Sequence, residues 1–351
     1  MGLFGPKLQP PTVGPTHLSG RVCVVTGSNG GIGKEIAAGL VGEGAEVVLA
    51  CRSMEKCERA KAEIESRGLS GTCRCSQLDV DDPKSIREFV RREKRELQGR
   101  PLSILVNNAG VMGSFSARDV WPGLTSGPTM TPPEVWHPSR DPHVGPNHLG
   151  PFLLTLLLLP SMRPGSRVVT VASEAHRRAP PLGLSQDTPG AILDNPSGWY
   201  KQYARSKLLN VMMTGEVQRR AYADGRGVSA TSVSPGRVAS NIFDSVPGAL
   251  RPALRWLSQA AFRTPTEGAA TALKACLDPQ LGWPHSPGAL YMHDLEVVEA
   301  SEQARDVALQ RRLWDVSEFY VGESLGELPR PDTVPAPQRE PVSAQAPRSS
   351  R

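Results

Sequence analysis

Two side chains suited to proton transfer, Tyr203 and Lys207, are four residues apart in the segment Tyr-Ala-Arg-Ser-Lys. Residues at this spacing share one face of an α-helix, so the ammonium group would lie beside the phenol. A free tyrosine has a pKa of ~10 and is a poor base at neutral pH. A neighbouring positive charge favours the phenolate and lowers that pKa. The pair therefore predicts a proton-transfer site, although the same spacing also occurs by chance on many helices.

A glycine-rich turn, Thr26-Gly-Ser-Asn-Gly-Gly-Ile-Gly33, directly follows an apolar run and precedes a helical pattern. Glycines let the backbone turn tightly and approach a pyrophosphate, whose charge is stabilised by the N-terminus of the helix. Such a turn alone is a weak signal, because a plain strand-to-helix turn can look the same. The dinucleotide site that it predicts consists of Gly27, Ser28, Asn29, Gly31, Ile32 and Gly33.

The form T-G-x-x-x-G-I-G resembles the fingerprint of the short-chain dehydrogenase/reductase family, and further motifs similar to that family's follow in the expected order. They are Asp79-Val80, Asn107-Asn108-Ala109-Gly110, Asn147-His-Leu-Gly-Pro-Phe152, Ser173, Tyr203-Ala-Arg-Ser-Lys207 and Pro235-Gly236. The resemblance covers residues 20 to about 320. It implies a Rossmann-type fold, a nicotinamide cofactor and the interconversion of a carbonyl and an alcohol.

The resemblance also implies a role for each motif. Tyr203 would transfer the proton, Ser173 would hold the substrate oxygen, and Lys207 would also bind the nicotinamide ribose. Asp79 and Val80 would contact the adenine. The other residues implied to contact or support the cofactor are Asn108, Ala109, Gly110, Pro235, Gly236, Val238 and Ser240. No metal site is expected.

Asn147 is the fourth implied catalytic residue, and two prolines flank it. Pro151 has no N–H group, so the Asn147 carbonyl lacks its usual helical partner. In the family this carbonyl holds a water molecule that connects to the active-site lysine, and Pro151 would keep it free. Pro146 disfavours helix at the residues before it and predicts that the helix starts late. Whether these prolines impair turnover stays open.

The choice of cofactor depends on Cys51-Arg52-Ser53, which follows the second predicted strand. NAD-dependent proteins place an acid near this position to bind the ribose 2′-hydroxyl, and here the position holds Cys51. Arg52 can instead pair with a 2′-phosphate through its fixed fork of donors, with Ser53 beside it. NADP(H) is therefore the expected cofactor. The alternative is that Arg52 is a plain surface arginine.

Three features resemble the retinol-dehydrogenase-like branch of the family: Ala-Cys-Arg after the second strand, Asn-His-Leu-Gly, and Leu-Trp314 near the end. The branch implies a lipophilic alcohol, aldehyde or ketone as substrate, retinoid-like or steroid-like for example. Fold and catalytic residues do not determine the substrate, however. The alternative from another class is an NADP-binding scaffold or sensor with little or no turnover.

Alternating apolar runs and helical patterns must position these residues. Their lengths and order predict an α/β fold of the Rossmann type with a doubly wound parallel sheet. The expected strands are 21–25, 46–50, 72–78, 102–106, 167–172, 228–233 and 289–292, and the expected helices are 32–41, 55–67, 83–97, 147–162, 199–222, 266–277 and 301–320.

One domain of residues 21–322 is expected, preceded by an irregular arm at 1–20 and followed by a disordered tail at 323–351. Residues 111–146 form a proline-rich insertion. The net charge of +5 is spread among acids, so nucleic-acid binding is not expected. The six scattered cysteines support neither a zinc site nor a disulfide framework, and a reducing compartment is the default.

No apolar stretch approaches the ~20 residues of a membrane span, and the start of the chain lacks the pattern of a secretory signal. A cytoplasmic, organelle-stromal or membrane-peripheral location is therefore expected. The basic amphipathic segment 243–262 reads as a substrate-pocket lid or as a peripheral membrane contact. A homo-oligomer stays open.

Overall fold

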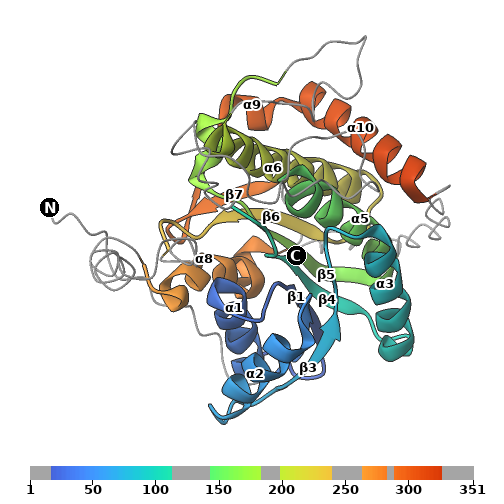
Figure 1. The fold of residues 1–351 in the computed structure, drawn as a ribbon, viewed down its shortest axis with the longest axis vertical. Helices are drawn as coiled ribbons and strands as arrows, with labels where there is room; N and C mark the ends of the chain where they lie inside the picture. Colours follow the sequence, from blue (N-terminus) through green and yellow to red (C-terminus); the bar gives the residue numbers. More distant parts are fainter. Residues whose placement is uncertain (1–16, 113–142, 183–197, 239–262, 283–287, 326–351) are drawn as a thin grey trace, which may run out of the picture.

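A computed structural model describes residues 17–112, 143–182, 198–238, 263–282 and 288–325, and these form one eight-stranded sheet with helices on both faces (Figure 1). The strand order is β3-β2-β1-β4-β5-β6-β7-β8, with all pairs parallel except β7 and β8. The strands are β1 Val22–Thr26, β2 Glu46–Cys51, β3 Thr72–Gln77, β4 Leu102–Asn107, β5 Met162–Val171, β6 Ser229–Ser234, β7 Leu290–His293 and β8 Glu296–Val298. The predicted doubly wound parallel fold is confirmed.

The helices divide between the two faces of the sheet (Figure 1). Alternate residues of β1 show the division, because Val24 packs in the core with α3, α5, α6 and α10, whereas Val25 packs with α1, α2 and α8. The helices are α1 Gly31–Gly42, α2 Met54–Glu65, α3 Pro83–Leu97, α5 Gly150–Leu158, α6 Trp199–Ala223, α8 Pro265–Leu277, α9 Glu302–Arg305 and α10 Val307–Leu325. Short turns of other types are η2 Gly145–Leu149, η3 Leu159–Ser161, η4 Glu174–Arg178 and η7 Pro279–Leu281.

Local signals set several helix ends. Helix α3 has the predicted bounds, because the Asp82 carboxylate accepts a hydrogen bond from the Lys84 N–H and Pro83 occupies the first turn. Helix α8 begins with a capping box in which Thr264 and Glu267 satisfy each other's backbone N–H groups.

The last predicted helix, 301–320, is in fact two helices. Asp306 has an extended backbone, with φ −67° and ψ 107°, which ends α9. Its side chain then accepts hydrogen bonds from the N–H groups of Ala308 and Leu309, at 2.8 and 3.1 Å, so that it starts α10. Helix α10 continues to Leu325, and both α9 and α10 pack against α6 (Figure 1).

Strand β8 was not predicted from the sequence. It pairs antiparallel with β7 through a two-residue turn, Asp294-Leu295, in which both residues have positive φ. This backbone matches the twist of a hairpin, but leucine is not a residue that signals it. The turn is therefore visible only in the structure.

The expectation of no disulfide was wrong, because Cys57 and Cys75 are joined. Cys57 is on α2 and Cys75 is on β3, and the packing of that helix on its strand brings their Cα atoms to 6.0 Å. The sequence shows only a separation of 18 residues, which carries no information on this packing. The other four cysteines, which are free and buried, are Cys23, Cys51, Cys73 and Cys276.

Several predicted segments lie wholly or largely outside the described residues. These are the amphipathic segment 243–262, most of the arm 1–20, most of the insertion 111–146 and all but the start of the tail 323–351, so the division into domains stays a prediction. Among the helices that the structure describes, none has the length and apolarity to cross a membrane.

Candidate active site

The predicted site residues gather where the parallel strands end, on either side of the point at which the strand order reverses between β1 and β4. Ligands of open α/β sheets bind at such an edge. Tyr203 and Lys207 are on α6, Asn147 is in η2, and Ser173 follows β5. The glycine-rich turn joins β1 to α1 at the same edge.

Tyr203 and Ser173 are both partly exposed, and the Ser173 hydroxyl is close enough to the phenol to affect its pKa. Burial raises the pKa of Tyr203, and the Ser173 side chain lowers it in part. The expected lowering of the Tyr203 pKa by Lys207 is therefore wrong for the protein's own groups. Lys207 lies with its Nζ 5.8 Å from the centre of the Tyr203 ring, and the pKa of Tyr203 is shifted by its burial, by Ser173 and by Tyr200.

Lys207 is buried and donates a hydrogen bond from Nζ to the Val171 carbonyl at 2.9 Å. Burial lowers the pKa of Lys207 to about 8. The ammonium form therefore still predominates at neutral pH. Gly110 lies nearby, since a Cβ there would be 3.5 Å from Nζ.

The side-chain amide of Asn147 is fully buried and joins two parts of the site. Its Oδ1 accepts from the Val111 N–H at 2.7 Å, and its Nδ2 donates to the Val111 carbonyl at 2.8 Å and to the Ser206 hydroxyl at 2.9 Å. The amide therefore connects the segment after β4 to α6. Its proposed role in catalysis stays a prediction.

The predicted late start of the helix at Asn147 was wrong. Val144 already has helical φ and ψ, and the Asn147 N–H donates to the His143 carbonyl at 2.9 Å. The chain forms a π-helical turn, η2, in which the Gly150 N–H bonds to the Gly145 carbonyl. Pro146 fits because it occupies the first turn, where a missing N–H leaves no bond unmade.

The glycine-rich turn has the shape that a pyrophosphate requires. Gly27 has φ +66°, and a Cβ there would come within 2.9 Å of the Ala109 Cα. A Cβ on Gly31 would meet no protein atom within 4 Å, so the backbone is open at the start of α1. The residues at this turn therefore fit a dinucleotide.

Polar groups hold the turn against the end of β4. The Thr26 hydroxyl accepts from the N–H groups of Asn108 and Ala109 at 3.0 and 2.9 Å. Asn108 Nδ2 donates to the Thr26 carbonyl at 2.8 Å. The Asn-Asn-Ala-Gly motif thus supports the turn, and its expected role at the cofactor stays a prediction.

Cys51, at the position where an acid would bind a ribose, is buried under the glycine-rich turn. Its thiol accepts hydrogen bonds from the backbone of Ser28 and Asn29, and the Ser28 hydroxyl lies 3.5 Å from Sγ. Arg52, next in the chain, is exposed. Ser53 caps α2 by accepting from the Lys56 N–H at 3.4 Å, a role that the sequence analysis did not consider.

Asp79 and Val80 follow β3 and are partly buried at the same edge. The Asp79 carboxylate accepts from the Asp81 N–H at 3.0 Å. Burial and the Asp79 charge raise the pKa of Asp81 to about 6, although Arg52 lowers it.

The last predicted cofactor residues follow β6. Pro235, Gly236 and Val238 are described there, and a Cβ on Gly268 would come within 2.5 Å of the Val238 side chain and 3.3 Å of the Ile32 side chain. Gly33 is buried at the start of α1. Ser240 lies outside the described residues.

Two histidines near the site were missed by the sequence analysis. The His143 ring meets the Tyr203 ring edge-on, with centroids 6.3 Å apart. His176 follows Ser173 by three residues and accepts or donates at both ring nitrogens. The sequence signal that could have identified His176 was its place in the segment Ser-Glu-Ala-His.

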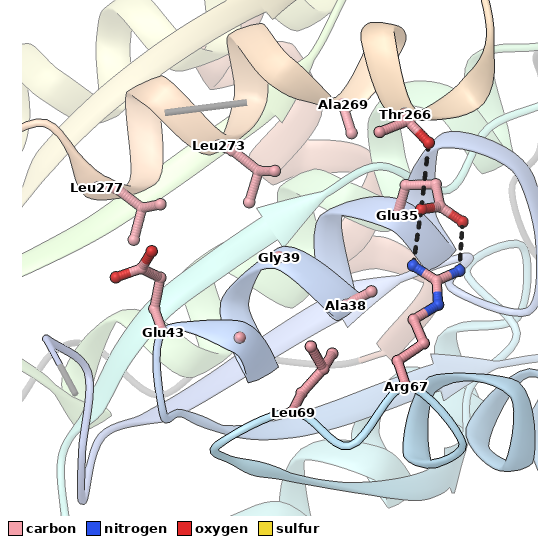
Figure 2. Close-up of a pocket in the computed structure, with 11 residues that line it drawn as sticks. Glu35, Ala38, Gly39, Glu43, Arg67, Leu69, Thr266, Ala269, Leu273 and Leu277 are labelled. Carbon is pink, nitrogen blue, oxygen red and sulfur yellow. Dashed lines mark hydrogen bonds and ion pairs between the residues drawn. The ribbon is translucent and has the colours of Figure 1, made fainter. Parts of the chain in front are cut away.

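A groove of about 230 Å³ lies away from these residues, between α1 and α8. Figure 2 shows the Arg67–Glu35 pair at one end and Leu273 and Leu277 along one side. None of the predicted site residues that the structure describes lines it.

Comparison with known proteins shows the family. A family model described as short chain dehydrogenase matches residues 21–184. Dehydrogenase/reductase SDR family member 13 from Bos taurus is 36% identical over 326 residues, which cover 91% of this chain and 78% of the relative. Human retinol dehydrogenase 11 is 36% identical over 310 residues, with 87% of each chain covered.

Solved structures agree on the fold. An uncharacterized protein from Mycobacterium paratuberculosis superposes with a TM-score of 0.60 at 26% identity, covering 90% of this chain and 95% of its own. A short chain dehydrogenase from Burkholderia cenocepacia in complex with NADP has a TM-score of 0.55 at 24% identity, with coverages of 79% and 98%. The chain therefore belongs to the short-chain dehydrogenase/reductase family, in its retinol-dehydrogenase-like branch, and is an oxidoreductase that acts on CH–OH groups with a nicotinamide cofactor.

Proposed function

We propose that this oxidoreductase uses NADP(H) to interconvert a lipophilic alcohol and its carbonyl, with Tyr203 as the proton-transfer residue. The observation that carries the proposal is that the partly exposed Tyr203 and Ser173 hydroxyls lie together, with Lys207 on the next turn of α6 and its Nζ 5.8 Å from the centre of the Tyr203 ring. A substrate oxygen can meet both hydroxyls there.

Each side chain has a separate task in this proposal. The nicotinamide, when bound, exchanges a hydride with the substrate carbon. Tyr203 donates its phenolic proton to the developing alkoxide in reduction, or removes the alcohol proton in oxidation. Ser173 holds the substrate oxygen, and Lys207 supplies positive charge and a donor for the ribose. Asn147 holds Val111 and Ser206 in place.

The preference for NADP(H) is supported by the end of β2. The buried Cys51 thiol faces the underside of the turn, and the exposed Arg52 is the charged residue beside it. No carboxylate stands at position 51 to bind a 2′-hydroxyl, whereas a guanidinium suits a 2′-phosphate. The Burkholderia protein of the same fold was solved with NADP.

A lipophilic substrate is supported by the relatives and by one exposed side chain. One relative is named human retinol dehydrogenase 11, and retinol is a lipophilic retinoid alcohol. In this chain Val111 is 40% exposed, although its backbone is bound by the buried Asn147. The apolar side chain of Val111 is thus exposed to solvent beside α6, the helix that carries Tyr203.

The second candidate is an NADP-binding scaffold or sensor, in which Pro146 and Pro151 next to Asn147 would have cost turnover. A peripheral membrane contact, a homo-oligomer and a cytoplasmic or organelle-stromal location remain predictions of the sequence.

The test compares the parent with Tyr203→Phe on a panel of retinoid, steroid and short aldehydes and ketones, followed by NADPH absorbance. Loss of the proton donor should reduce turnover by ~10²–10⁴-fold, while calorimetry should show nearly unchanged NADPH binding. Tyr222→Phe, which removes a hydroxyl from an exposed tyrosine at the far end of α6, is the control and should keep the parent rate. A parent that binds NADPH but turns over nothing on the panel would favour the scaffold.

A further inference from the structure

The buried His176 ring is bonded at both nitrogens. Nδ1 lies 2.8 Å from the Ser173 carbonyl, and Nε2 lies 3.1 Å from the Ser301 backbone nitrogen. Because Nε2 must accept from a backbone N–H, the ring is neutral with its proton on Nδ1. Nδ1 therefore donates to the Ser173 carbonyl.

The turn that carries His176, η4, is also held by β7. The Tyr291 hydroxyl donates to the Glu174 carboxylate at 2.6 Å, and Arg177 donates to the same carboxylate at 2.9 Å. The rings of His176 and Tyr291 meet edge-on with centroids 4.8 Å apart. Residues more than 110 positions later in the chain thus hold this turn.

These contacts converge on Ser173. Its hydroxyl oxygen accepts from the Ala175 N–H at 3.1 Å, and its carbonyl accepts from His176. The backbone of Ser173 is extended, with φ −168° and ψ 152°, so nothing in its own conformation forces the hydroxyl toward Tyr203. The direction of the hydroxyl follows from the bonds on either side of it.

We propose that His176 is a positioning residue for Ser173, through which the segment from Tyr291 to Ser301 sets the distance between the Ser173 and Tyr203 hydroxyls. The proposal rests on the proposed function. His176 itself does not take part in proton transfer, because both of its ring nitrogens are bonded to backbone groups.

Three variants of His176 separate its two bonds. Asparagine places an amide N–H near the position of Nδ1 and can keep the bond to Ser173. Glutamine places a carbonyl near Nε2 and can keep only the bond to Ser301, and alanine keeps neither. With a known substrate, His176→Ala and His176→Gln should lower kcat by roughly 10- to 100-fold, as a misplaced catalytic group does. His176→Asn should retain most of kcat, and the KM for the cofactor should not change.

A double-mutant cycle tests whether the effect passes through Ser173. In the Ser173→Ala background, His176→Ala should change kcat by less than about twofold. Ser317→Ala is the matched control, because it removes another buried histidine bond, the one between the Ser317 hydroxyl and His148 Nε2 at 2.8 Å. The control should lower the melting temperature and leave kcat unchanged. The proposal would be overturned if the losses of kcat in His176→Ala and Ser173→Ala multiplied in the double variant. It would also be overturned if His176→Ala lowered the melting temperature and left kcat unchanged.

A spectroscopic readout needs no substrate. The ¹³Cζ resonance of Tyr203, identified by its loss in Tyr203→Phe, should shift in Ser173→Ala because the phenol loses the Ser173 hydroxyl beside it. His176→Ala should shift it in the same direction, and His176→Asn should restore it. An unmoved resonance in His176→Ala refutes the positioning role, whereas a parent without turnover refutes the proposed function.

Discussion

The two halves of the site differ in how deeply their side chains are buried. At the ends of β4 to β6, Lys207 and Asn147 are buried and bonded within the protein. At the ends of β2 and β3, Arg52 is exposed, and Ser53 and Asp79 are only partly buried. Changes in the first half should therefore alter stability and turnover together, whereas changes in the second half should alter cofactor choice and little else.

The largest effect is expected at Lys207. Lys207→Met keeps an unbranched apolar chain but removes the ammonium group, so turnover should fall by about 10²-fold or more and cofactor binding should weaken. Steady-state kinetics and NADPH titration measure the two effects. Lys201→Met, at an exposed lysine on the same helix, should change neither.

The same variant has a pH-dependent effect on stability. The pKa of Lys207 is lowered to about 8, so the unfolded chain binds more protons than the folded protein above that pH. The free energy of unfolding of the parent, relative to Lys207→Met, should rise by up to about 3 kcal/mol between pH 8 and 10.5. Urea titrations at several pH values measure this difference, and a flat difference would contradict the burial of a charged amine.

Asn147→Asp should destabilise the protein by about 1–3 kcal/mol. The new carboxylate oxygen would face the Val111 carbonyl, to which the amide now donates at 2.8 Å. Urea unfolding measures the loss. Ser206→Ala removes one of the three bonds of the amide and should cost less, so an equal or larger cost would show that the contact with Val111 matters little.

Arg52→Ala should erase most of an at least tenfold preference for NADPH over NADH, since a charged hydrogen bond contributes about 1.5–3 kcal/mol. Calorimetry with both cofactors measures the preference. Arg59→Ala, an exposed arginine on α2, should leave it intact. If the parent protein bound NADPH and NADH with equal affinity, Arg52 would not select the cofactor.

The smallest effect is expected at Ser53, whose hydroxyl caps α2. Ser53→Ala should cost about 0.5–1 kcal/mol of stability and leave NADPH affinity within about twofold. Thr264→Ala, at the cap of α8, should give a similar loss of stability and no change in affinity. A much weaker NADPH affinity in Ser53→Ala alone would show that Ser53 also binds the cofactor.

Most of the sheet and the position of the site could be predicted from short segments. The spacing of apolar residues predicted seven of the eight described strands, and the helix predicted at 83–97 has the bounds of α3. Prolines misled the prediction at Asn147, because the rule on the residue before a proline does not foresee a π-helical turn. Asp306 likewise looks like any helical residue until its extended backbone is seen.

The sequence by itself determined the parallel α/β fold and the place where Tyr203, Ser173 and the glycine-rich turn meet. This was possible because helical and strand periodicities are local, and because parallel strands present their ends at one edge of a sheet. Only the tertiary structure decided the Cys57–Cys75 bond, the direction of the Tyr203 pKa and the attachment of His176 to Ser301. Each of these depends on which distant residues exclude water or come within bonding distance, and no spacing along the chain encodes that.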